Sequence, residues 1–222
     1  MSLNKTRRYS RHTYGDNGAL GHKNILSVSF VATDLGKPVV ADDNRILDNQ
    51  ATGIATTTVT SFLAQPDVPR NITVKAGGTQ ADVKAGDVVV TGTNVEGATI
   101  TESFSFLEHS VSTVTDSKAF KTVTSILFPI QDDVGATFKV GVGAKLGIGM
   151  RNIASMPVKV MVNTAGAETI EDAGASALSA TVVESNTVTT TTAMTGAIGY
   201  RVYVLNYKWA INPDNSTPDY GV

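Results

Sequence analysis

The chain has 222 residues, of which 41% are hydrophobic and 17% charged, and its formal net charge is −2. This composition is typical of a globular protein long enough to bury a core, which excludes a disordered chain. Cysteine is absent, so disulfides, thiolate metal sites and cysteine nucleophiles are excluded. No window holds the roughly 20 apolar residues of a membrane helix, and no secretory signal is visible, so we expect no membrane partner.

The first residues differ from the rest in charge. Residues 1–23 contain five Lys and Arg against one Asp, a net +4 (5 − 1), which leaves −6 (−2 − 4) for the remainder. Residues 1–24 are polar and show neither helical nor strand periodicity, so we expect an extended basic arm that docks on an acidic neighbour. The alternative is a frayed terminus. The contact residues expected in the arm are Arg7, Arg8, Tyr9, Arg11 and Tyr14.

Strand patterns begin with the alternating run Ile25–Thr33. A turn-rich connection is expected over 34–45, followed by an extended run over Gly53–Ala64. The stretch QPDVPR ends that run, because its two prolines cannot donate hydrogen bonds to a sheet.

From residue 71 the alternation of apolar and polar residues is regular. DVVVTGT and ATITESFSF read as two strands joined by Asn94–Gly97, whose turn residues at both ends predict a hairpin. In the second strand Ile100, Glu102, Phe104 and Phe106 are expected on one face, with Thr and Ser on the other. Further strands are expected over 118–128, ended by Pro129, and over 136–149, where glycines indicate bends or close backbone contact.

After Met150 the alternation of apolar and polar residues is less regular. A short strand is expected over 156–163, the one candidate helix over 164–180, and a hairpin over 180–194. The last strand, GYRVYVLNYKW, places Val202 and Val204 on one face. Its other face carries a row of aromatic residues that is either core or an interface anchor, namely Tyr203, Tyr207 and Trp209.

Short strands about ten residues apart, separated by Gly, Pro, Asn and Asp, predict an all-β fold. We therefore expect an antiparallel β-sandwich of jelly-roll or immunoglobulin-like type over residues 25–211, preceded by the arm at 1–24 and followed by a C-terminal tail at 212–222.

The sequence holds little that resembles a reaction site. The histidines at 12, 22 and 109 lack metal-ligand spacing and are interpreted as solvated side chains. The pairs Asp42-Asp43 and Asp132-Asp133 lie in expected turns, where a structural role is favoured over calcium binding. Gly141-x-Gly143 lacks the glycine spacing of a phosphate loop and is interpreted as a strand relieved by glycine. We expect no catalytic residue, no metal and no cofactor, and hence not an enzyme.

Glu102 is the exception to this simple pattern, because it falls on the apolar face of its strand. A buried carboxylate needs a partner, such as Lys118, Lys121 or a backbone N–H, or a strand edge from which it reaches water. A structural role is favoured.

Residues 67–148 resemble a known family. PDVPRNITV, GDVVVTGTNVEGATITESFSF, SKAFKTVTSILFP and VGVGAKLGI occur in that order. The order VTGTN-x-x-G-x-x-ITE-x-F followed by KAFKTVTSI resembles small β-rich virion proteins of tailed bacteriophages, and the run covers about a third of the chain. The resemblance implies a structural part of a phage particle and carries no catalytic residues.

The leading hypothesis is a capsid decoration or cement protein in the virion, with the major capsid protein or other virion subunits as partners and homo-oligomers in the particle. A tail or neck subunit that forms rings or tubes is the second hypothesis. A carbohydrate- or receptor-binding module that uses Trp209 and the tyrosines is the third. Nucleic acid is not expected as a partner, because the acidic body and the pI of about 5.9 repel a polyanion.

Overall fold

A computed structural model describes residues 7–14, 25–150, 158–164, 167–171, 174–175, 179 and 181–209 of the chain. In this described part the strands are, in order, β1 (Arg7–Tyr14), β2 (Ile25–Gly36), β3 (Asp42–Ala51), β4 (Thr57–Val59), β5 (Arg70–Gly78), β6 (Gly86–Thr93), β7 (Thr99–Phe106), β8 (Thr113–Thr115), β9 (Thr122–Phe128), β10 (Ala136–Gly147), β11 (Val158–Thr164), β12 (Ala167–Glu171), β13 (Gly174–Ala175), β14 (Thr187–Thr189) and β15 (Gly199–Trp209). Two 3₁₀ turns, η1 (Gln80–Asp82) and η2 (Val183–Ser185), accompany them. Among these residues no helix has the length and hydropathy of a membrane-spanning segment.

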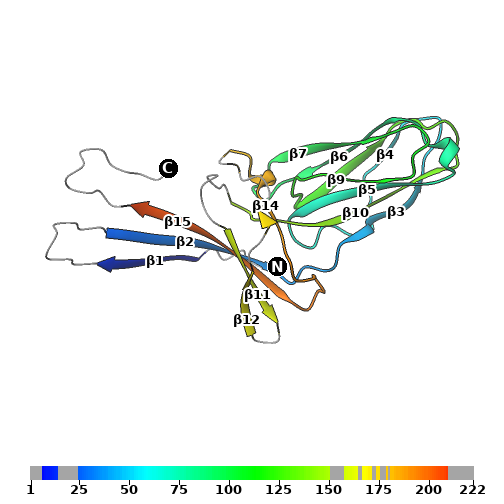
Figure 1. The fold of residues 1–222 in the computed structure, drawn as a ribbon. Helices are drawn as coiled ribbons and strands as arrows, with labels where there is room; N and C mark the ends of the chain where they lie inside the picture. The colour runs from blue at the N-terminus through cyan, green and yellow to red at the C-terminus, as the bar shows by residue number, and fades with distance from the viewer. Residues whose placement is uncertain are drawn as a thin grey trace.

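The strands form three antiparallel sheets. One has the order β13-β14-β10-β5-β8, with β3 also paired to β10, and a second has the order β4-β9-β6-β7. These two sheets face each other as a sandwich (Figure 1). The third sheet, β1-β2-β15-β11-β12, extends away from the sandwich. The antiparallel all-β sandwich expected from the sequence is therefore confirmed.

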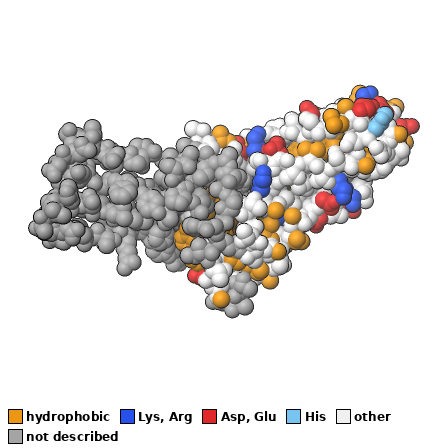
Figure 2. Space-filling view, in the orientation of Figure 1, with side chains coloured by type: hydrophobic (Ala, Val, Ile, Leu, Met, Phe, Trp, Pro, Cys, Tyr) orange, Lys and Arg blue, Asp and Glu red, His pale blue; other side chains and the backbone are white. Residues whose placement is uncertain are grey.

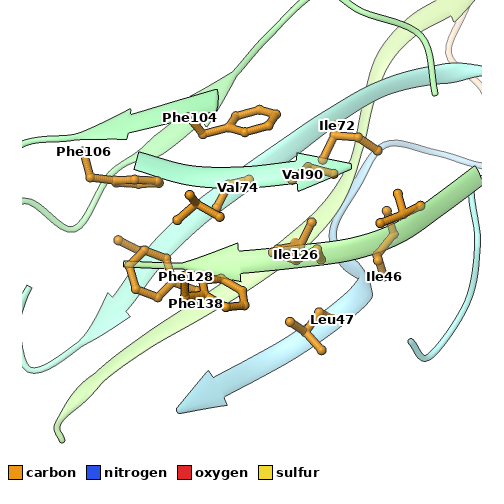
Figure 3. Close-up of a cluster of buried hydrophobic side chains, with 14 of the residues drawn as sticks. Ile46, Leu47, Ile72, Val74, Val90, Phe104, Phe106, Ile126, Phe128 and Phe138 are labelled. Carbon is orange, nitrogen blue, oxygen red and sulfur yellow. The ribbon is translucent and has the colours of Figure 1, made fainter. Parts of the chain in front are cut away.

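The core of the sandwich follows directly from side-chain alternation. Along β7 every second residue is buried, from Ile100 to Phe106, while the Thr and Ser residues between them are exposed. Figure 3 shows Phe104 and Phe106 among the side chains that lie between the two sheets. The ring of Phe138, from β10, packs edge-on against Phe106 and tilted against Phe128, with centroids 5.4 and 5.3 Å apart. Burial of these apolar faces is the main force that holds the sheets together.

A second, smaller core lies where the third sheet meets the sandwich. It joins the end of β10 to β11, β14 and β15. Its buried side chains are Leu35, Leu146, Ile148, Val160, Val162, Val188, Met194, Tyr200 and Val202. The third sheet is thus anchored at its base by apolar packing.

The third sheet continues beyond that base as what we call the projecting ribbon, which consists of β1, residues 25–32 of β2 and residues 203–209 of β15. The registers are continuous: Arg7 pairs with Ala32 and Tyr14 with Ile25, while Trp209 pairs with Leu26 on the other side of β2. Figure 1 shows the ribbon running away from the sandwich, and no other element that the structure describes lies over it.

Several local expectations are corrected by the structure. The helix expected over 164–180 is wrong, because its described residues form β12 and β13 instead. The hairpin expected over 180–194 is also wrong, since β14 pairs with β10 and β13. Residues 7–14, which lack strand periodicity, form β1.

Two strand boundaries also differ from expectation. β3 begins at Asp42, inside the connection expected over 34–45, and pairs with β10. The extended run expected over Gly53–Ala64 contains one short strand, β4. In both places the pairing with a distant strand, rather than local sequence, decides where regular structure begins.

Candidate functional site

The contact residues expected in the arm and in the last strand lie on two strands of the projecting ribbon. Arg7, Arg8, Tyr9, Arg11 and Tyr14 all lie in β1, and Tyr203, Tyr207 and Trp209 all lie in β15. β2 runs between them, so that Tyr9 and Leu205 both pair with Phe30. The backbones of β1 and β15 are therefore roughly 10 Å apart across β2. Apart from Tyr203, these side chains lie outside what the structure describes.

Tyr203 belongs to a polar cluster at the base of the ribbon. Its hydroxyl lies 3.8 Å from Sδ of Met161 and accepts a hydrogen bond of 3.5 Å from Arg201. The Arg201 guanidinium also lies 3.9 Å from Asp34 and 3.7 Å from Glu168. The contact with Tyr203, supported by the two carboxylates, raises the pKa of Arg201. Arg201, Asp34 and Glu168 border a cavity of about 410 Å³, together with Lys37, so positive and negative charges already offset one another there.

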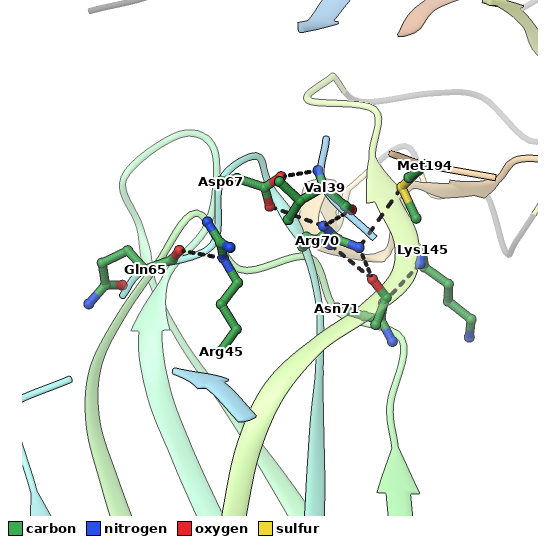
Figure 4. A network of polar contacts seen from close by, with 9 residues as sticks. Val39, Arg45, Gln65, Asp67, Arg70, Asn71, Lys145 and Met194 are labelled. Carbon is green, nitrogen blue, oxygen red and sulfur yellow. Dashed lines mark hydrogen bonds and ion pairs between the residues drawn. The ribbon is translucent and has the colours of Figure 1, made fainter. Parts of the chain in front are cut away.

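A buried arginine fixes the junction between the ribbon and the sandwich (Figure 4). The Arg70 side chain is fully buried and ion-paired with Asp67 at 3.0 Å. It donates hydrogen bonds to the backbone carbonyls of Val39 and Gly143 and contacts Sδ of Met194. Burial lowers the pKa of Arg70, and the nearby Asp67 carboxylate opposes that shift. The guanidinium thus ties together four segments that are distant in sequence.

Sequence reasoning did not identify Arg70. Its signal is weak: an Asp three residues before an Arg, in the proline-containing stretch QPDVPR. Beside this network a groove of about 680 Å³ separates the base of the third sheet from the sandwich, bordered by Leu35, Lys37, Val68 and Lys121.

Glu102 is buried, as its position in the alternation predicts, with 4% of its surface exposed. Its Oε1 accepts a hydrogen bond of 3.2 Å from the backbone N–H of Lys118, one of the partners expected from the sequence. The Lys118 ammonium group does not bind Glu102 and instead donates a hydrogen bond of 2.7 Å to the carbonyl of Thr101. Burial, together with the neighbouring Asp116 carboxyl, raises the pKa of Glu102 to about 8. The group is therefore mostly neutral at pH 7.

A second group of ionisable side chains lies at the tip of the sandwich remote from the ribbon (Figure 2). The ligand atoms of Glu108, His109 and Asp132 all lie within 4.8 Å of one another, and all three residues are exposed. Lys84 pairs with Asp132 at 3.0 Å, and this contact lowers the pKa of Asp132 and raises that of Lys84. The ammonium group therefore already supplies the positive charge that a cation would bring.

The acidic pairs and the glycine motif have structural explanations. Asp132 and Asp133 lie in a turn, as expected, whereas Asp42 and Asp43 begin β3. Asp43 pairs with Lys75 at 3.0 Å, and this contact lowers its pKa. A Cβ on Gly141 would lie 1.9 Å from the carbonyl oxygen of Asp42. The glycine at 141 thus permits close approach of β3, in agreement with the interpretation of the motif as a strand relieved by glycine.

No protein-family model, curated protein or solved structure matches this chain.

Proposed function

We propose that this protein is a structural subunit of a tailed-phage particle that binds the capsid shell as a decoration or cement protein. Two arguments support the proposal: the resemblance of residues 67–148 to small virion proteins, and the projecting ribbon. The projecting ribbon is the structural observation on which the proposal mainly rests. The ribbon is a three-stranded sheet that runs away from the sandwich and ends in an outer strand, β1, whose free edge is suited to pairing with a neighbouring subunit.

The charge of the ribbon indicates the kind of neighbour. β1 is the outermost strand of its sheet and carries Arg7, Arg8 and Arg11. A basic strand of this kind fits an acidic patch on a shell subunit, and electrostatic attraction of this type depends on salt. The decoration protein would span a junction between shell subunits and add contact area that the shell must lose before it opens.

Removing residues 1–23 should reduce binding to the shell at least tenfold, because it deletes the whole outer strand with its arginines. The measurement is occupancy on purified shells, by sedimentation with the shells and by negative-stain images. A matched variant, Arg7→Gln with Arg8→Gln and Arg11→Gln, keeps the strand and removes its charge. Unchanged occupancy of both variants would contradict the proposed role of β1.

A tail or neck subunit is the second candidate, favoured by one observation. In the described residues the third sheet is open at both sides, with β1 at one edge and β12 at the other. Contacts between different edges of neighbouring copies are head-to-tail, and such contacts close into rings or continue as tubes. Gel filtration and negative stain of the purified chain separate the candidates: rings or tubes without shell protein would favour the tail or neck, and a monomer or small oligomer the decoration role.

A further inference from the structure

The edge of the sandwich at β7 is closed by a short segment, Asp116–Lys118, which we call the clasp. The clasp is held from both sheets. From the sheet of β5 and β10, Asn71 donates to the carbonyl of Asp116 at 2.9 Å and Lys145 donates to the Ser117 hydroxyl at 2.9 Å. From the sheet of β7, Glu102 and Thr101 accept hydrogen bonds from the backbone N–H and the ammonium of Lys118. The clasp therefore spans the opening between the two sheets.

The strand behind the clasp is an edge strand, because β7 ends the order β4-β9-β6-β7. At the hairpin the N–H of Asn94 donates to the carbonyl of Ala98, and from this pair hydrogen-bonded and non-hydrogen-bonded pairs alternate along β6 and β7. It follows that alternate residues of β7 point their backbone N–H and C=O groups away from β6, namely Thr99, Thr101, Ser103 and Ser105. Lys118 covers the outward carbonyl of Thr101.

Glu102 contacts the clasp directly, so a change in the charge of its carboxyl group would act on residues 116–118. One carboxyl oxygen accepts a hydrogen bond from the Lys118 backbone N–H, whereas Oε2 is buried and makes no hydrogen bond of standard geometry in the described part of the chain. The Asp116 side chain beside it favours the protonated form of Glu102 through a hydrogen bond. The charged groups acting on Glu102 are Asp116 and Lys118, both from the clasp itself. On β6 it lies opposite the apolar Val90. A negative charge on Glu102 would be buried with one oxygen unsatisfied and a second carboxylate, that of Asp116, beside it.

We propose that Glu102 is a proton-operated latch: while it is neutral the clasp stays closed over the edge of β7, and when it ionises the clasp opens and uncovers that edge. The neutral carboxyl accepts the Lys118 N–H and places no charge beside Asp116. Ionisation introduces repulsion between the two carboxylates, which is relieved when Glu102 reaches water. For the Glu102 carboxylate to reach water, residues 116–118 must move away from β7. The hydrogen bond from the Lys118 ammonium to the Thr101 carbonyl is then lost as well. The pKa of about 8 places this change just above neutral pH.

The test compares the wild-type chain with Glu102→Gln, a neutral side chain of the same shape, at pH 6.5 and pH 9.5. Millisecond-pulse hydrogen–deuterium exchange measures the protection of the Lys118 amide relative to an unstructured peptide at the same pH. We expect protection in the wild type to fall at least tenfold at pH 9.5, with a midpoint that matches the titration of the Glu102 ¹³Cδ resonance. Protection in Glu102→Gln should change less than twofold.

A second variant keeps the proposal falsifiable if Glu102→Gln folds poorly. Asp116→Asn removes the neighbouring carboxylate, so the midpoint of Glu102 titration and of clasp opening should move together to lower pH, since burial alone then raises the pKa less. Equal loss of protection in wild type and Glu102→Gln, or a Glu102 titration with no change at Lys118, would overturn the latch.

Discussion

Replacing Arg70 with methionine should lower the free energy of unfolding by about 3 to 5 kcal/mol, the largest effect we expect of any single substitution outside the apolar core. The guanidinium is fully buried and is the partner of Asp67 and of the carbonyls of Val39 and Gly143. A methionine fills much of the volume but donates no hydrogen bond. It leaves the Asp67 carboxylate, whose side chain is only 15% exposed, and two carbonyls without that partner, and each such loss is costly in a buried site.

Urea denaturation followed by circular dichroism measures this loss. Arg45→Met is the matched control, because Arg45 is only partly buried and its hydrogen bond to the carbonyl of Gln65 is long at 3.4 Å. That control should cost less than about 1 kcal/mol. Adding Asp67→Asn to Arg70→Met should recover part of the stability, since it removes the uncompensated charge. A loss below about 1 kcal/mol in Arg70→Met would show that the network does not hold the junction.

Gly141→Ala should destabilise the protein by about 3 kcal/mol, because the added methyl group has no room. Its Cβ would lie 1.9 Å from the carbonyl oxygen of Asp42 and about as close to the backbone of Asp43, at 2.4 and 2.5 Å. These are backbone atoms of β3, so the contact can be relieved only if β3 moves away from β10. That movement would also stretch the ion pair between Asp43 and Lys75.

Gly77→Ala is the control, since a Cβ at that position in β5 meets its nearest atom, the Thr137 hydroxyl oxygen, at 3.4 Å. The control should change the free energy of unfolding by less than about 1 kcal/mol. Thermal unfolding of both variants gives the comparison directly. Equal stability of the two would mean that β3 adjusts to the methyl group without strain.

The parts of the fold that the sequence predicts well are those in which local pattern and tertiary contact agree. In β7 the alternation of Phe and Ser fixes which side chains are buried, and the turn residues of Asn94–Gly97 fix the hairpin, so both were predictable. Glu102 stood out for the same reason, because it breaks the alternation. Its hydrogen bond to the Lys118 backbone was among the partners that the sequence left open.

The parts that the sequence does not predict depend on pairing between distant segments. Residues 7–14 show no alternation, and they form a strand through pairing with β2, a partner that the local pattern does not indicate. The placement of β1 and β15 on opposite sides of β2 has no local signal. The charged start of β3 reads as a turn, and nothing local marks Arg70 as buried, until the segments that surround them are in place.

The projecting ribbon has a mechanical consequence. β2 and β15 both leave the sandwich beside the same guanidinium: Val39, shortly after β2, accepts a hydrogen bond from Arg70, and Met194, shortly before β15, contacts it. Arg70 therefore contacts both connections between the ribbon and the sandwich, beside the apolar packing at the base of the third sheet. A load applied to the far end of the ribbon by a neighbouring molecule would be transmitted along β2 and β15 to this junction, where Arg70 and the buried apolar side chains link the third sheet to the sandwich.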